Sequence, residues 1–168
     1  MSEHVADDEF KRLAASVVSN FRARLGIDLN YDKPSIEWLD EYINRVGPKL
    51  NKEEVSGLAT SLGAYLGETI IATCGGAWHY SEEINHWAIR FDDGMMAFPL
   101  SKVYKQLEGG AADSILSFFR CCRLFAKTHS LRLINCLPEN SHEGFASKRG
   151  DLSQPLEVGL AACRAAVR

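Results

Sequence analysis

The feature that most constrains the fold is a change of hydrophobic period just after Cys74. Before this point apolar residues recur every three or four positions, which is the spacing of amphipathic helices. After it they alternate with polar residues, which is the spacing of strands with one buried face. Two glycines, Gly75 and Gly76, stand at the change. The chain is therefore predicted to leave a group of helices and enter an antiparallel sheet, which defines an α+β fold.

Helices are predicted over residues 8–25 and 35–46, and a third opens at a capping box formed by Asn51 and Glu54 and ends before Gly75. The third helix has the strongest period. Its small residues also stand four apart, and each glycine costs about 1 kcal/mol in a helix interior relative to alanine. This spacing indicates close approach by another backbone, along a groove formed by Ala59, Gly63 and Gly67.

Three short strands are predicted, over residues 77–81, 86–91 and 95–98. In the first hairpin Tyr80 is placed opposite Trp87. The Asp93-Gly94 pair predicts a two-residue turn in the second hairpin, which places Phe91 opposite Met96 and Ile89 opposite Phe98. These registers gather the large apolar side chains on a single face. The face consists of Trp78, Tyr80, Trp87, Ile89, Phe91, Met96 and Phe98.

Two more helices are predicted after the strands, one with Pro99 in its first turn and one capped by Asp113. The predicted architecture is thus a set of N-terminal helices packed on a small antiparallel three-stranded meander, followed by two helices. We expect a single domain over about residues 5–130. Residues 131–168 form a weakly patterned C-terminal segment, whose long stretch without a period favours mobility.

Composition excludes several classes of function. The 19 basic and 22 acidic residues give a net charge of −3, so no broad cationic surface for nucleic acid or anionic lipid is expected. No apolar run is long enough to span a membrane, and the acidic N-terminus argues against a secretory signal. The five cysteines contain no CxxC pair, which favours reduced thiols and a cytoplasmic location. No nucleotide-binding, zinc-protease or hydrolase motif occurs, so no cofactor is predicted.

The polar face of the predicted sheet is one candidate binding site. Its side chains are His79, Ser81, His86 and Arg90. Two imidazoles, a hydroxyl and a guanidinium are suited to anion binding or to acid–base chemistry near neutral pH. The alternative is that a sheet covered on one side simply shows polar residues on the other.

Glu68 is the other candidate residue, because a carboxylate near the end of a helix opposes the helix dipole. This position suggests a specific partner, such as a strand amide, an arginine or a ligand, although a plain exposed glutamate is the alternative. A metal set drawn from nearby residues has suitable ligand types but an unconvincing spacing, so no metal is predicted. That set is Cys74, His79, Glu82 or Glu83, and His86.

Charge is distributed unevenly along the chain. Residues 31–100 carry 11 acidic and 5 basic residues, a net charge of −6, whereas residues 101–168 have a net charge of +4. The middle stretch is a candidate acidic surface for a basic protein partner. The alternative is a set of solvated helix faces and turns. The surface consists of Glu37, Asp40, Glu41, Glu53, Glu54, Glu82 and Glu83.

A resemblance to a known family adds to this interpretation. A helix ends in Tyr65-Leu66-Gly67-Glu68, a Gly-Gly break and the strand start Ala77-Trp78 follow, and a later strand end Phe98-Pro99 leads into a helix with Val103 and Lys105. This order resembles a bacterial family of small α+β domains of uncharacterised function, over about residues 36–120. The resemblance implies a bacterial, cytoplasmic protein with an α+β core, and it brings no catalytic residues.

Three functional hypotheses follow. The first is a non-catalytic protein-binding module, an immunity-type inhibitor or adaptor, whose acidic surface contacts a basic partner. The second is a small hydrolase or ligand-binding enzyme that uses His79, His86 and Arg90 together with Glu68. The third is self-association, for example as a homodimer, through the small-residue groove or the C-terminal segment.

Overall fold

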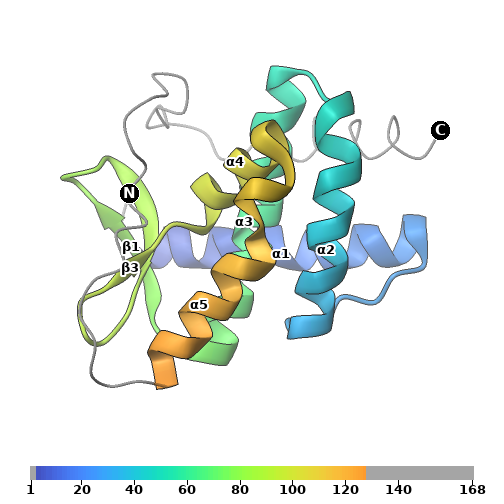
Figure 1. Ribbon diagram of the computed structural model, residues 1–168. Helices are drawn as coiled ribbons and strands as arrows, with labels where there is room; N and C mark the ends of the chain where they lie inside the picture. Colours follow the sequence, from blue (N-terminus) through green and yellow to red (C-terminus); the bar gives the residue numbers. More distant parts are fainter. Residues whose placement is uncertain (1–2, 128–168) are drawn as a thin grey trace.

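The structure is a computed structural model that describes residues 3–127 of the chain, and the predicted C-terminal segment 131–168 lies outside the described residues. The described part contains five α-helices, two short 3-10 turns and one three-stranded antiparallel sheet (Figure 1). The α+β class predicted from the sequence is confirmed. The helices are α1 (Glu3–Leu25), α2 (Lys33–Val46), α3 (Lys52–Cys74), α4 (Pro99–Gly109) and α5 (Ile115–Lys127), and the strands are β1 (Ala77–Ser81), β2 (His86–Arg90) and β3 (Met96–Ala97).

Local sequence signals account for the starts of α2 and α3. The capping box that opens α3 is confirmed: Asn51 Oδ1 accepts a hydrogen bond from the Glu54 N–H at 3.0 Å, and the Asn51 N–H donates to Glu54 Oε2 at 2.8 Å. Helix α2 begins at Lys33, before the predicted start, because Asp32 accepts from the Ser35 N–H at 2.9 Å. Helix α1 also begins earlier than predicted, at Glu3.

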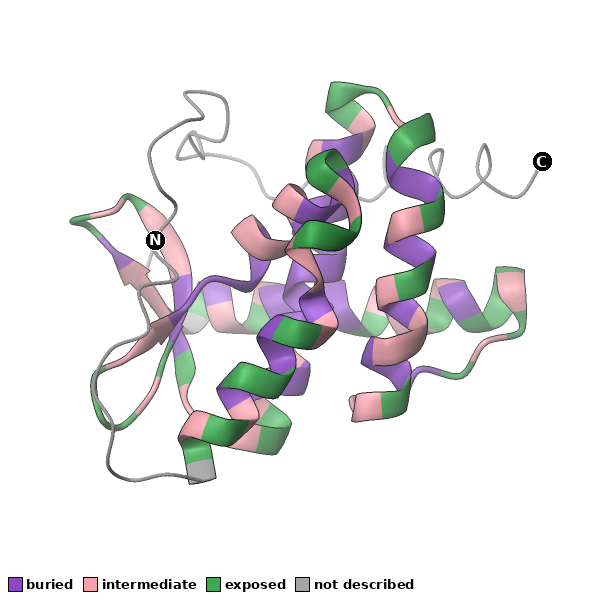
Figure 2. Ribbon diagram, in the orientation of Figure 1, coloured by how far each residue is buried: buried purple, intermediate pink, exposed green. Residues whose placement is uncertain are grey.

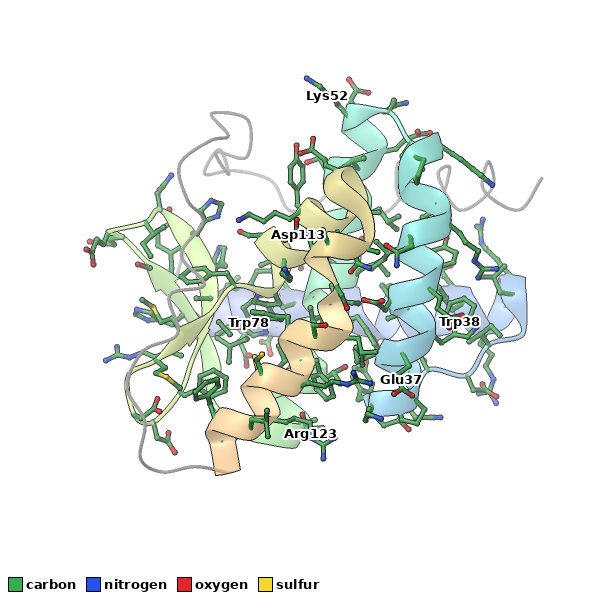
Figure 3. All side chains as sticks on the ribbon, viewed as in Figure 1. Glu37, Trp38, Lys52, Trp78, Asp113 and Arg123 are labelled. Carbon is green, nitrogen blue, oxygen red and sulfur yellow. The ribbon has the colours of Figure 1, made fainter. Side chains whose placement is uncertain are left out.

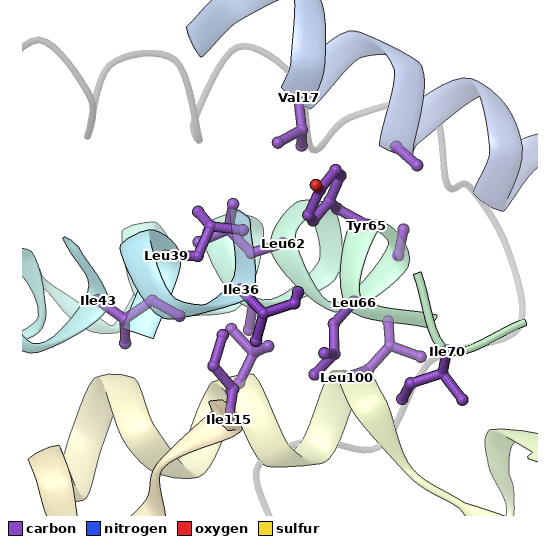
Figure 4. Packing of buried hydrophobic residues seen from close by; sticks show 14 of the residues in the cluster. Val17, Ile36, Leu39, Ile43, Leu62, Tyr65, Leu66, Ile70, Leu100 and Ile115 are labelled. Atoms are coloured by element: carbon purple, nitrogen blue, oxygen red, sulfur yellow. The ribbon is translucent and has the colours of Figure 1, made fainter. Parts of the chain in front are cut away.

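Helix α3 forms the centre of the molecule and packs against both α1 and α4. Helix α1 crosses on the far side of the other helices in Figure 1, and the sheet forms one end of the molecule. Buried residues line the surfaces where the helices meet (Figure 2). In the core, side chains of α2 and α3 interdigitate with those of α4 and α5 (Figure 4). The labelled core residues of Figure 4 are Val17, Ile36, Leu39, Ile43, Leu62, Tyr65, Leu66, Ile70, Leu100 and Ile115.

The small-residue groove of α3 is filled by the same chain. A Cβ added at Gly63 would lie 2.6 Å from the Cα of Leu100, so the predicted close approach of a backbone is confirmed there. At Gly67 the neighbour is a side chain instead, because an added Cβ would lie 2.2 Å from the indole of Trp78. Since α4 and Trp78 occupy the groove, it does not offer a contact surface to a second copy of the chain.

The first hairpin has the predicted register, with Tyr80 opposite Trp87 and Trp78 opposite Ile89. The predicted register of the second hairpin is wrong by one residue. Ile89 pairs with Ala97 and not with Phe98.

The cause is the length of the second turn. The Phe91 N–H donates to the Met95 carbonyl at 2.9 Å and the Gly94 N–H donates to the Phe91 carbonyl at 3.0 Å. These bonds close a loop of three residues, 92–94, that ends in a glycine with φ of +85°. A loop of this kind is the next most common hairpin connection after the two-residue turn. Because of this shift, Met96 pairs with Arg90 and lies on the other face of the sheet from Ile89, not on the predicted apolar face.

The start of α5 also differs from the prediction. The helix begins at Ile115 and follows Ser114, whose hydroxyl accepts from the Ser117 N–H at 3.1 Å. The predicted cap, Asp113, instead pairs with Lys102 at 2.9 Å. A serine in the position before the helix satisfies one of its free N–H groups, as an aspartate would.

Candidate functional site

Trp78 connects the sheet to the helices (Figure 3). Its indole stacks on Phe10 of α1, with 4.0 Å between ring centroids, and lies against the backbone of Gly67 in α3. The indole Nε1–H donates a hydrogen bond to Glu68 Oε1 at 2.8 Å. Indole N–H groups usually need an acceptor when buried, so Glu68 allows this large ring to be buried at the junction of α1, α3 and β1.

Of the two interpretations of Glu68, the structure has the one with a specific partner, and that partner is an indole N–H, which the sequence analysis did not name. Burial is the largest influence on this half-buried carboxylate and raises its pKa above the ordinary value. The hydrogen bond from Trp78 and the charge of Lys11 act in the opposite direction, and Asp7 adds to the increase. The net result is a carboxyl group with a raised pKa at the centre of a small polar cluster.

Two further elements contribute to this cluster. From α1, Lys11 donates to Asp7 at 2.6 Å, one helical turn away. From the loop between α1 and α2, Tyr31 stacks on Tyr65 with 5.0 Å between ring centroids, and its N–H donates to the Tyr65 hydroxyl at 3.0 Å. The pKa of Tyr31 is raised, first by burial and then by the neighbouring Tyr65 and Glu68.

Sequence reasoning missed the residues that surround Glu68. Asp7 and Lys11 stand four apart on α1, a spacing that predicts their ion pair but not their place beside Glu68. Tyr31 has a backbone φ of +51°, which is uncommon for a bulky residue, and no sequence signal indicates it. The cluster could only be recognised once α1, α3 and the α1–α2 loop were placed together.

The polar face of the sheet brings some of the predicted residues together. Ser81 lies directly opposite His86, and His79 lies opposite Ala88. Ser81 and Ala88 are buried and Arg90 is exposed, while burial lowers the pKa of His86. The imidazole of His86 therefore favours its neutral form.

Glu68 does not join this face. Successive residues of a strand point to opposite sides of a sheet, so Trp78, which Glu68 contacts, and His79 leave β1 on opposite sides. The structure therefore divides the predicted binding set into a histidine face and a Glu68 cluster. Within residues 3–127 no group of three or more His, Cys, Asp or Glu side chains is placed to hold a metal ion.

Three of the predicted acidic residues are engaged by other groups of the chain. Asp40 points inward, where its Oδ1 accepts from Gln106 Nε2 at 3.1 Å, from the Ser114 hydroxyl at 2.8 Å and from the Leu116 N–H at 3.1 Å. Glu54 belongs to the capping box of α3. Glu37 pairs with Lys33 at 2.7 Å and lies 3.5 Å from Arg120.

Exposed carboxylates remain at Glu41, Glu53, Glu82 and Glu83. Glu82 and Glu83 occupy the β1–β2 turn, at the end of the sheet that projects from the helices (Figures 1 and 2). Beside this turn, the rings of Tyr80 and Trp87 meet edge-on with 5.2 Å between centroids, and both are half-buried. The Tyr80 hydroxyl donates to the Asn85 side chain, which fixes the turn. The β1–β2 turn thus combines two carboxylates with an aromatic pair.

A scan against models of protein families finds no match, and searches of curated proteins and of solved structures find no similar protein. The resemblance to a bacterial family of small α+β domains therefore stays a prediction. In the described part of the chain, none of the helices combines the length and the apolar character that crossing a bilayer requires.

Proposed function

We propose that the protein is a non-catalytic binding domain that recognises a basic protein partner through the β1–β2 turn. The observation that carries this proposal is the placement of exposed Glu82 and Glu83 beside the half-buried rings of Tyr80 and Trp87. Tyrosine and tryptophan are enriched among the residues that dominate binding energy, and polar groups form the rim of an interface. Carboxylates at the rim attract and orient a cationic partner.

The roles of the other polar groups support binding over catalysis. Asp40 and Glu54 each serve the fold, Asp40 as an acceptor at the start of α5 and Glu54 as part of the capping box of α3. The predicted enzyme required Glu68 beside His79 and His86, and the two faces of the sheet separate them. We therefore do not propose the enzymatic function.

The contact itself is the function in this proposal, so the protein acts as an immunity-type inhibitor or an adaptor in a bacterial cytoplasm. Among the described residues, Cys74 and Cys121 are free thiols, which supports a reducing compartment. The opposite charge of an inhibited basic protein would accelerate association.

The proposal is tested by affinity capture from the source organism with three versions of the full chain. The wild type is compared with the double variant Glu82→Lys, Glu83→Lys, and with a control, Glu41→Lys, Glu53→Lys, that changes the charge equally at exposed sites elsewhere. We expect a basic protein that is captured by the wild type and by the control, is lost with the turn variant, and is released by added salt. Capture of the same proteins by all three versions, or of none by the wild type, would overturn the proposal.

A further inference from the structure

Glu68 holds a negative charge that the described part of the chain leaves without a direct counter-ion. None of the ion pairs formed within residues 3–127 includes Glu68. Its hydrogen bond from Trp78 uses Oε1, and no other hydrogen bond reaches its carboxylate from the described residues. The neighbouring Lys11 is held by Asp7 at 2.6 Å. A half-buried carboxylate is unfavourable unless a cation or further donors match it.

The ring of Tyr31 stacks on Tyr65, which lies one helical turn before Glu68 on α3, so an aromatic ring is placed near this charge. Tyr31 adopts a φ of +51°, a left-handed backbone conformation that is unfavourable for a residue other than glycine. One face of its ring is stacked on Tyr65, and the side chain is only partly buried. Such strain persists where the surrounding structure enforces it and is concentrated at functional sites.

We propose that Glu68 and Tyr31 form a binding site for a guanidinium group, supplied by an arginine side chain of the protein partner. The guanidinium pairs with the carboxylate and lies against the phenol ring. Arginine fits better than lysine because its planar guanidinium stacks on aromatic rings and is more weakly hydrated than an ammonium group. It can also donate two parallel hydrogen bonds to one carboxylate. Asp7 of α1 adds negative charge around the site and Lys11 opposes it. The origin of the arginine rests on the proposed function, whereas the site itself does not.

A purely structural role for Glu68 is the competing explanation, and one substitution separates the two. Glu68→Gln keeps an oxygen that accepts from the Trp78 indole but removes the charge. If Glu68 only holds Trp78 in place, Glu68→Gln and the wild type do not differ in how they bind a guanidinium group. If the charge recognises a guanidinium, the variant folds normally and loses that binding.

The experiment titrates the ¹⁵N-labelled full chain with the capped peptide acetyl-Gly-Arg-Gly-amide. Two control peptides replace arginine with lysine or with citrulline, its neutral analogue. The readouts are the indole Nε1–H signal of Trp78 and the amide signal of Tyr31. We expect saturable shifts with a dissociation constant on the order of 10 mM for the arginine peptide, and binding about tenfold weaker for the citrulline peptide and for Glu68→Gln. Equal shifts with the citrulline peptide, or unchanged binding to Glu68→Gln, would overturn the site.

The ring is tested separately. Tyr31→Phe keeps the aromatic face and is expected to bind the arginine peptide as the wild type does, whereas Tyr31→Leu binds several-fold more weakly. Equal binding by the two variants would exclude the role of the ring. These measurements use only the peptide, so they can fail while capture through the β1–β2 turn succeeds. If the arginine peptide binds but the double variant Glu82→Lys, Glu83→Lys still captures the partner, the result would support the Glu68 site and overturn the proposed role of the β1–β2 turn.

Discussion

Glu68 and Trp78 are joined by a hydrogen bond of 2.8 Å between the carboxylate and the indole N–H, which ties α3 to β1 across the point where the hydrophobic period changes. Gly67, the residue before Glu68, provides the space that the ring needs, because an added Cβ would lie 2.2 Å from the indole. Two neighbouring residues of α3 therefore act on the same ring: Gly67 leaves room for it, and Glu68 accepts a hydrogen bond from its N–H.

The stability of the protein is expected to depend on the protonation of Glu68. Because burial raises its pKa above the ordinary value of 4.5, the folded chain binds this proton more tightly than the unfolded chain does. The resulting stabilisation is complete below the ordinary pKa and is lost as the pH rises through the raised pKa of the folded state. Glu68→Gln has no such proton.

We therefore expect the free energy of unfolding of the wild type to rise relative to that of Glu68→Gln as the pH falls from neutral toward 4.5. Urea unfolding followed by tryptophan fluorescence at a series of pH values measures this difference. A difference that stays constant, or that shrinks as the pH falls, would show that the raised pKa is wrong.

The sequence identified Glu68 as an unusual carboxylate but could not identify its partner. The helix dipole depends only on the position of a residue in its own helix, so the sequence was enough to recognise Glu68 as an unfavourably placed carboxylate. The partner lies ten positions further along the chain, across the Gly75-Gly76 break. Tyr31 is more distant still from Tyr65 in sequence, and only the packing of the loop on α3 brings the two rings together.

The contact between α3 and α4 is expected to depend on the absence of a side chain at residue 63. In Gly63→Ala the new Cβ would meet backbone atoms of Leu100, at 2.6 Å from its Cα, and backbone cannot move aside easily. Overpacking of this kind typically costs about 1–3 kcal/mol, which outweighs the gain of about 1 kcal/mol in helix propensity. Thermal or urea unfolding measures the loss.

Gly109→Ala is the matched control for this prediction. Gly109 is exposed, and a Cβ there would meet only the Asp113 carboxylate, at 3.3 Å. Because that side chain can rotate away, the control is expected to remain close to the wild type in stability. A stable Gly63→Ala variant would mean that α4 can shift along α3.

The β2–β3 turn is expected to depend on the backbone freedom of Gly94. Its φ of +85° is unfavourable for residues with a Cβ, and nothing lies within 4 Å of an added Cβ, so the effect of a substitution is confined to the backbone. Gly94→Ala should cost about 1–2 kcal/mol. Gly94→Asn should cost less, since asparagine tolerates left-handed backbone better. Equal unfolding free energies for the two variants would contradict this account.

The same turn explains why one register was predictable and the other was not. In the first hairpin, hydrophobic alternation alone placed Tyr80 opposite Trp87, since any other register separates the apolar faces. In the second, the Asp93-Gly94 pair fits both a two-residue and a three-residue loop. The choice shifts every partner by one, and strand β3 is too short for its few side chains to decide it.

Asp40 is expected to stabilise α5 more than the aspartate next to that helix in sequence. Asp40 Oδ1 accepts from Ser114, from the Leu116 N–H and from Gln106, which itself accepts from the Ile115 N–H at 2.8 Å. Asp40→Ala removes the acceptor of the partly buried Ser114 hydroxyl and Leu116 N–H, whereas Gln106 Nε2 keeps Asn44 Oδ1 as an acceptor. Leaving such donors unsatisfied should cost about 2–3 kcal/mol.

The contrast with Asp113 makes this prediction specific. Asp113 precedes α5 in sequence and was the predicted cap, but its carboxylate pairs with Lys102, and the side chains are 36% and 23% exposed. A partly exposed pair of this kind contributes about 0–1 kcal/mol, so Asp113→Ala should be nearly neutral. Urea unfolding at neutral pH should therefore rank Asp40→Ala well below Asp113→Ala in stability. The reverse order would mean that Asp113 stabilises α5. The hydrogen bonds of Asp40 would then be a result of helix packing and would contribute little to stability.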